Sequence, residues 1–270
     1  MPIAALPSAL ETRDLTKAFV RPAVDALNLR VYPGEFYILL GANGAGKTTT
    51  LRMIAGLLPP DSGAIFVHGT DTLADPIAAK RLMAWLSDEP MIYDKLSPLE
   101  YLDFVAGLWG VPYATARTQG AALLDMLGLA PFGRDRCESL SKGMRQKVAL
   151  AGALVHDPKL IILDEPLTGL DAGSARIVKT VLRERLADGA AVIMTTHILD
   201  VAERMADRIG VIDQGRLIAE GTMAELRQHA NAGDAQGGDG KGGDASLEDV
   251  FLSLIAPQTK DESLPPLTLS

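Results

Sequence analysis

The segment from Gly41 to Thr49 constrains this chain more than any other, because it matches the G-x-x-x-x-G-K-[ST] pattern of a phosphate-binding loop. An apolar run at 36–40 precedes the loop, and a helix-competent stretch at 50–56 follows it. Strand, glycine-rich turn and helix in this order form the context that the pattern requires. The sequence therefore predicts a strand–loop–helix unit that holds a triphosphate.

Each residue type in this loop suits phosphate binding. Glycines let backbone N–H groups converge on phosphate oxygens at positions where a Cβ would intrude. Lys47 supplies a positive charge for the β- and γ-phosphates, and Thr48 offers a hydroxyl to Mg²⁺. The helix that begins here adds the positive end of its dipole. A glycine-rich turn without a ligand is the alternative, and the flanking strand and helix disfavour it. The residues expected to bind the triphosphate are Gly41, Ala42, Asn43, Gly44, Ala45, Gly46, Lys47, Thr48 and Thr49.

Composition limits the classes of partner. A net charge of −8 and a pI of about 5.1 argue against a surface built for nucleic-acid phosphates, so we expect no nucleic-acid partner. Cys137 is the single cysteine of the chain, so no intrachain disulfide can form. Residues 1–10 lack the charged start of a signal peptide, and no apolar stretch approaches the roughly 18 residues of a membrane span. We therefore expect no segment that crosses a bilayer.

Short apolar runs alternate with helical patterns along most of the chain, which predicts parallel βα units. The runs at 160–163 and 191–194 are almost entirely apolar, as in central strands that are covered on both faces. We therefore predict an α/β fold of the P-loop NTPase type, with a mixed sheet and flanking helices. Strands are expected at 36–40, 82–86, 160–163, 191–194 and 209–212, and helices after Gly46 and at 172–186 and 198–205.

The middle of the chain has a different pattern. No segment from 97 to 156 predicts a strand, and three helices are expected there, beginning near Ser97, Pro112 and Ser141. Ser97 is followed by proline and then by Glu100, which is the pattern of an N-cap with a capping box. The predicted organisation is a domain at 8–228 with a helical subdomain at about 90–157, a Gly/Asp-rich linker at 229–245, a C-terminal helix at 246–256 and a disordered tail at 257–270.

A hydrophobic strand at 160–164 ends in two carboxylates. Asp164 at the strand end can hold Mg²⁺ directly or through water, next to the lysine of the loop. Glu165 is placed one residue further on, where it can polarise an attacking water. Acidic residues after a strand are common, and alone this segment leaves the two interpretations evenly balanced. Pairing with the phosphate loop favours the catalytic interpretation.

A second candidate anion site lies at 140–146. Ser141 as an N-cap with glycine nearby exposes N–H groups and the positive end of a helix dipole. Without other motifs, an ordinary capped helix is the better interpretation.

Taken together, these motifs resemble the ATP-binding subunit of ATP-binding-cassette (ABC) transporters. The resemblance covers nearly all of residues 10–228, and the set of motifs is specific although only the phosphate loop is so by itself. In the family's order they are Phe19 as the adenine-stacking aromatic, the phosphate loop 41–49, a glutamine-loop region near 88, the signature 140–144, the acidic strand 160–165, Gly169-Leu170-Asp171 as the D-loop and Thr195-Thr196-His197 as the switch histidine.

The resemblance implies a head-to-tail dimer in which the signature of one protomer closes over ATP on the other. His197 is then implied to contact the γ-phosphate, and Asp171 to link the two sites. Val24 is a candidate second adenine contact beside Phe19. Considered alone, His197 would be a polar residue after a core strand, and Phe19 a core residue. The signature residues implied to bind ATP are Ser141, Lys142, Gly143 and Met144.

Two positions depart from the family pattern. Asp88 stands where the family usually has glutamine; it can approach Mg²⁺ but repels a γ-phosphate that the metal does not screen. The signature reads Ser-Lys-Gly-Met, so Lys142 adds a positive charge and Met144 lacks the amide that can contact ribose. Both departures bear on the rate of hydrolysis more than on ATP binding.

The resemblance implies an ATP-hydrolysing subunit that uses ATP and Mg²⁺ and forms a homodimer on the cytoplasmic face of the cell membrane. It would drive a separate polytopic permease, whose helix enters a groove near 88–101. The ending at 246–251, with 141–146, resembles the ABC-2 subgroup, which is mostly associated with export. The apolar groove contacts are expected to be Met91, Ile92, Tyr93 and Leu96.

Two alternatives remain open at this point. One is a regulatory ATP-binding module with little hydrolysis, for which Asp88 and Met144 would be signs of decay, whereas intact Glu165 and His197 argue against it. The other is a soluble ABC ATPase outside transport, which the acidic pI and the single cassette disfavour.

Overall fold

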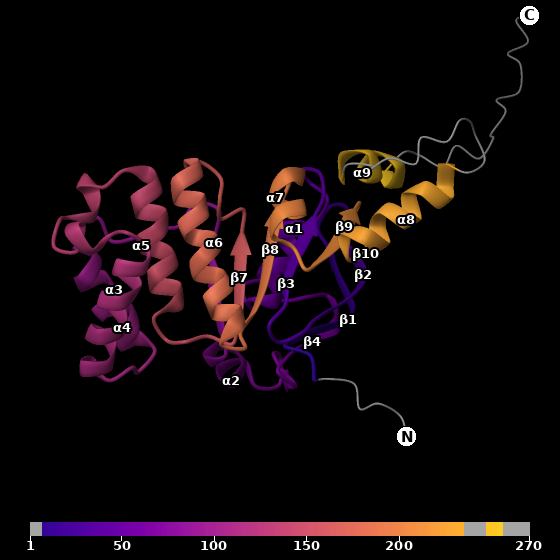
Figure 1. Cartoon of the computed structure of the whole chain (residues 1–270). Coiled ribbons are helices and arrows are strands. Elements are labelled where there is room, and N and C mark those ends of the chain that lie inside the picture. The colour runs from indigo at the N-terminus through magenta and orange to yellow at the C-terminus, as the bar shows by residue number, and fades with distance from the viewer. Residues whose placement is uncertain (1–6, 235–246, 256–270) are drawn as a thin grey trace, which may run out of the picture.

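The computed structural model of the chain describes residues 7–234 and 247–255 (Figure 1). Three helices of the predicted insert stand side by side at one end of the molecule, and two sheets with their flanking helices form the rest of the main body. The predicted α/β fold is confirmed.

A six-stranded sheet carries the centre of the fold. Its strand order is β10-β9-β3-β8-β7-β6, and all neighbours are parallel except β10 against β9. Alternate residues of β3 enter different clusters, Phe36 and Ile38 on one face of the sheet and Tyr37 and Leu39 on the other. Because both faces are covered, the central strands read as continuous apolar runs. The strands are β3 (Phe36–Leu40), β6 (Met83–Leu86), β7 (Leu160–Asp164), β8 (Ala191–Thr196), β9 (Arg208–Asp213) and β10 (Arg216–Gly221).

A four-stranded antiparallel sheet packs beside it, in the order β2-β1-β4-β5. Its strands are β1 (Leu10–Ala18), β2 (Pro22–Val31), β4 (Ser62–Val67) and β5 (Thr70–Asp71). None of them was among the predicted strands. Their burial alternates irregularly because register shifts interrupt the pairing of β1 with β2 and with β4. Their inner residues join the apolar cluster that also holds α1 (Lys47–Ile54), and α2 (Pro76–Arg81) follows β5.

The helical insert forms as predicted. Ser97 caps α3 (Pro98–Leu108) in a full capping box with Glu100. Pro112 is the N-cap of α4 (Tyr113–Met126), and Ser141 is the N-cap of α5 (Lys142–Leu154), with the 3₁₀ turns η1 (Ala130–Phe132) and η2 (Cys137–Ser139) between them. Residues 97–156, all of which are described, contain no strand.

The C-terminal part is more helical than expected. After α6 (Ala172–Ala187) and α7 (Leu199–Met205), helix α8 (Met223–Asp234) runs six residues into the predicted linker. Helix α9 (Leu247–Ile255) falls within the predicted 246–256 and contacts both α7 and α8. The rest of the predicted linker and the predicted tail lie outside the described residues. No helix of the described part is long and apolar enough to cross a membrane.

Candidate active site

The phosphate loop joins β3 to α1, and the backbone of two other segments packs closely against it. Gly46 has φ +108°, and a Cβ placed there would lie 2.3 Å from the carbonyl oxygen of Ala23. The same carbonyl limits Gly215, where a Cβ would approach to 2.8 Å. Gly215 lies in the turn between β9 and β10, and its N–H donates to the carbonyl oxygen of Ala45 at 2.9 Å. Glycine at 46 is therefore required by packing as well as by an approaching phosphate.

Lys47 lies inside the loop, only 6% exposed. Its Nζ donates to the carbonyl oxygens of Gly41 at 2.7 Å and Ala42 at 3.1 Å. Burial lowers the pKa of Lys47, and the nearby carboxylates of Glu165 and Asp164 oppose that shift. The ammonium group of Lys47 is thus held by backbone carbonyl oxygens, and the oxygens of a bound phosphate can take their place as hydrogen-bond acceptors.

Asp164 ends β7 at the bottom of the site, 1% exposed. Its Oδ1 accepts hydrogen bonds from Thr195 Oγ1 at 2.6 Å and from Thr48 Oγ1 at 3.2 Å. Its Oδ2 is buried and has no hydrogen-bond partner among the described residues. A buried carboxylate oxygen without a partner, next to a threonine hydroxyl, is a set of oxygen donors that fits Mg²⁺.

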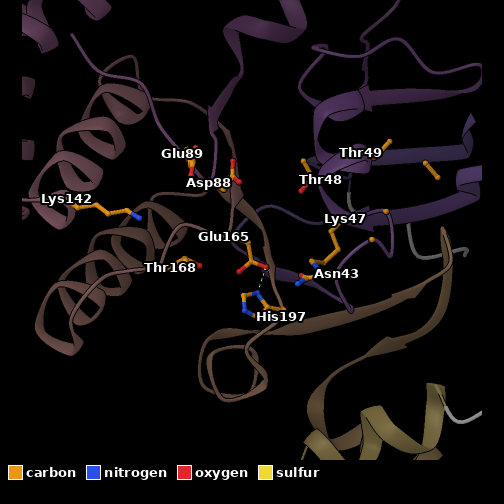
Figure 2. Close-up of a pocket in the computed structure, with 13 residues that line it drawn as sticks. Asn43, Lys47, Thr48, Thr49, Asp88, Glu89, Lys142, Glu165, Thr168 and His197 are labelled. Carbon is orange, nitrogen blue, oxygen red and sulfur yellow. Dashed lines mark hydrogen bonds and ion pairs between the residues drawn. The ribbon is translucent and has the colours of Figure 1, made fainter. Parts of the chain in front are cut away.

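Glu165 and His197 meet in the cavity, as Figure 2 shows. Nδ1 of His197 donates to Oε1 of Glu165 at 2.8 Å, because a carboxylate can only accept. Glu165 has φ +46°, which is unusual for a residue with a side chain, and its N–H donates to Thr195 Oγ1 at 3.1 Å. Thr195 therefore fixes Asp164 by its hydroxyl hydrogen and the backbone of Glu165 by its oxygen.

Lys47, Thr48, Glu165 and His197 line one cavity of about 380 Å³, whereas the buried Asp164 is bonded to Thr48 but does not itself line the cavity. Figure 2 shows Lys142 reaching into it from α5, on the side opposite Lys47. Sequence reasoning missed Ala23, Glu89 and Thr168; of these, Ala23 and Glu89 each adjoin a predicted residue, Val24 and Asp88 respectively. The predicted residues that line the cavity are Asn43, Gly44, Gly46, Lys47, Thr48, Thr49, Asp88, Lys142, Glu165 and His197.

Other predicted residues lie around this cavity. Phe19, in the turn between β1 and β2, is 62% exposed and is free to stack on a flat ring. Ser141 caps α5 and Asp171 caps α6, so both also have a structural role. Ser141, Gly143 and Met144 do not line the cavity of their own chain.

Val24 is a correction. Its side chain is 0% exposed and belongs to the apolar cluster between the two sheets, so it cannot contact an adenine. Neighbouring side chains of a strand point to opposite faces, and it is Ala23 that lines the cavity. The predicted residue thus lies one position after the residue of β2 that lines the cavity.

The chain is similar to known proteins in both sequence and fold. The family model described as ABC transporter matches residues 24–168. The daunorubicin/doxorubicin resistance ATP-binding protein DrrA of Streptomyces peucetius is 42% identical over 221 residues, 81% of this chain and 67% of DrrA. The linearmycin resistance ATP-binding protein LnrL of Bacillus subtilis is 35% identical over 218 residues, 80% of this chain and 70% of LnrL. A solved structure of the ATP-binding subunit of an ABC transporter superposes with a TM-score of 0.82 at 31% identity, covering 92% of this chain and 99% of that one.

Proposed function

The chain belongs to the ABC transporter family as an ATP-binding subunit with ATPase activity, and from this premise we propose that it drives export through a separate membrane permease by ATP-dependent dimerisation. One observation carries the proposal. The lysine of the phosphate loop, Thr48 and the Glu165–His197 pair line a single cavity at the carboxyl ends of parallel strands. Thr48 in turn bonds to the buried Asp164, whose second oxygen has no partner among the described residues.

The proposed division of labour follows from the contacts. Backbone N–H groups of the loop and Lys47 bind the phosphates, while Thr48 and Asp164 would hold Mg²⁺, and Asp88 lines the same cavity as Thr48. When bound, Mg²⁺ neutralises charge on the phosphate oxygens. Glu165 accepts a proton from the attacking water, and His197 holds the Glu165 carboxylate in place.

A second copy of the chain is the proposed partner across the site. The N-terminus of α5 presents Ser141 and the free N–H groups of Lys142 and Gly143, yet only Lys142 lines the cavity of its own chain. A helix N-terminus of this kind suits the γ-phosphate of a nucleotide held by another protomer. We assign Phe19 to adenine stacking and Asp171 to contact between the two sites in that dimer.

The proposed permease contact is a groove lined by Trp85, Met91, Tyr101, Trp109 and His156, beside the helical insert. Met91 is 94% exposed there. Ile92, one of the apolar contacts expected from the sequence, is buried within the core and is unavailable. The names of DrrA and LnrL state drug resistance, which supports export as the direction of transport. A permease partner would place this chain at the cytoplasmic face of the membrane.

Phosphate release by the purified chain tests this function. Glu165→Gln removes the proton acceptor but keeps the shape, so turnover falls by about 100-fold or more while ATP still binds. Glu184→Gln is the matched control, because Glu184 is exposed on α6 and does not line the cavity. Equal turnover in the two variants would refute Glu165 as the base. A parent chain that binds ATP without releasing phosphate would instead favour the regulatory module.

A further inference from the structure

The loop at 90–97 lies between the nucleotide cavity and the helical insert. Asp88 and Glu89, just before it, line the cavity, while Met91 lines the apolar groove. The loop then turns toward the chain segment that leads into α5, and several bonds connect the two. Only a few residues therefore connect the loop that borders the groove with the N-terminus of α5, so a movement of the one would displace the other.

The bonds between these segments form a compact set. The N–H of Cys137 donates to the carbonyl oxygen of Leu96 at 2.9 Å, and the N–H of Glu138 donates to that of Asp94 at 3.1 Å. Lys95 Nζ lies 2.5 Å from Glu138 Oε2, and the Arg136 guanidinium donates to the carbonyl oxygen of Lys95. Backbone and side chains thus tie residues 94–96 to residues 136–138, immediately before the signature.

One ion pair continues this set into α5. Nη2 of Arg145 lies 2.6 Å from Oδ1 of Asp94. The backbone N–H of the same arginine donates to the carbonyl oxygen of Ser141 at 2.9 Å. Arg145 therefore connects Ser141 directly with the loop that borders the groove.

The position of Arg145 is unfavourable for the helix itself. It lies in the first turn of α5, where the positive end of the helix dipole repels a cation. Half-exposed ion pairs of this kind add little to stability. Arg145 thus carries a charge that does not stabilise α5, and this charge faces the carboxylate of Asp94. We take this as an indication that Arg145 positions the signature and is not needed for folding.

We propose that Asp94 and Arg145 are positioning residues that hold Ser141–Met144 in register for the nucleotide of the partner protomer. This inference rests on the proposed function, because it assumes the dimer. Loss of the pair lets the N-terminus of α5 shift relative to the groove loop. Neither Asp94 nor Arg145 lines the nucleotide cavity of the same chain, and Lys142 is the one residue of Ser141–Met144 that does. Nucleotide there is held mainly by Lys47 and the phosphate loop, so its affinity changes little.

Dimerisation in a Glu165→Gln background tests the proposal, with sedimentation velocity in Mg·ATP as the readout. Each dimer contains two pairs, each contributing about 1.5- to 5-fold, so Arg145→Gln and Asp94→Asn each weaken association by about 2- to 25-fold. The swap Asp94→Arg with Arg145→Asp, and the conservative Arg145→Lys, recover most of the loss. Affinity for a fluorescent ADP, measured at monomer concentrations, stays within about 2-fold.

Arg117→Gln is the matched control, because the Arg117–Asp103 pair at 3.0 Å joins α4 to α3 within the same insert and does not reach the signature. Dimerisation of Arg145→Gln equal to that of Arg117→Gln overturns the inference. A parallel loss of ADP affinity overturns it too, because it shows a general structural defect. If the Glu165→Gln parent itself stays monomeric in Mg·ATP, the proposed dimer is wrong and the inference falls with it.

Discussion

Replacing Thr195 by valine removes the hydroxyl group and keeps the shape of the side chain. Thr195 is fully buried, donates to Asp164 Oδ1 at 2.6 Å and accepts from the Glu165 N–H at 3.1 Å. Valine has nearly the same volume but cannot form a hydrogen bond with either the Asp164 carboxylate or the Glu165 N–H. A hydrogen bond to a carboxylate contributes about 1.5–3 kcal/mol, and a buried N–H without a partner costs about 1–3 kcal/mol. Because the two effects share one site, we expect a loss of about 3 kcal/mol rather than their sum.

Thr195→Ser is the control, because it keeps the hydroxyl and gives up one buried methyl, about 1 kcal/mol. In a chain of this size 1 kcal/mol corresponds to roughly 2–4 °C in Tm. The valine variant should therefore melt about 6–12 °C below the parent and the serine variant about 2–4 °C below it.

The two variants should also differ in turnover. Without the bond to Thr195, the Glu165 backbone loses a contact that holds its positive φ, and a displacement of about 1 Å costs about 100-fold in rate. Circular dichroism melts give the first comparison, and phosphate release well below both melting temperatures gives the second. Equal Tm and equal turnover in the valine and serine variants would refute this account of Thr195.

Two further predictions concern the loop and the groove. Gly46→Ala places a Cβ 2.3 Å from the Ala23 carbonyl at φ +108°, so the urea midpoint should fall by the equivalent of about 3 kcal/mol or more. Gly189→Ala, at φ +88° with open space around it, should cost about 1 kcal/mol, and equal midpoints would contradict the packing argument. Burial lowers the pKa of His156, whose ring donates to the Met83 carbonyl at 3.1 Å, so its contribution is present above pH 6.5 and is lost as pH falls below that value. His156→Gln should flatten the decline of Tm between pH 7 and 5, and an unchanged decline would exclude His156 as its source.

The parts of the fold that sequence reasoning predicted are those with strong local signals. The continuous apolar runs of β7 and β8 reflect strands covered on both faces, and the capping box at Ser97 fixes the start of α3 within one residue. The segment 41–49 predicted both a turn and a bound phosphate, because this order of glycine and lysine residues is typical of a phosphate-binding loop.

The parts that were missed depend on contacts between distant residues. Strands β1 and β2 mix polar and apolar residues irregularly because bulges shift their register, so no period of two marks them. For the same reason the face of β2 could not be chosen between Ala23 and Val24. The role of Thr195 comes from its bonds to the carboxylate of Asp164, at the end of the neighbouring strand, and to the backbone N–H of Glu165, which follows it; no local pattern of β8 contains these partners.

The carbonyl oxygen of Ala23 has a consequence for the hairpin formed by β9 and β10. This one atom sets the closest approach of both Gly46 and Gly215, and Gly215 in turn bonds to Ala45. The turn between β9 and β10 therefore helps to set the shape of the phosphate loop, although none of its side chains lines the nucleotide cavity. A substitution in that turn should therefore alter the affinity for nucleotide, although neither Gln214 nor Gly215 lines the cavity.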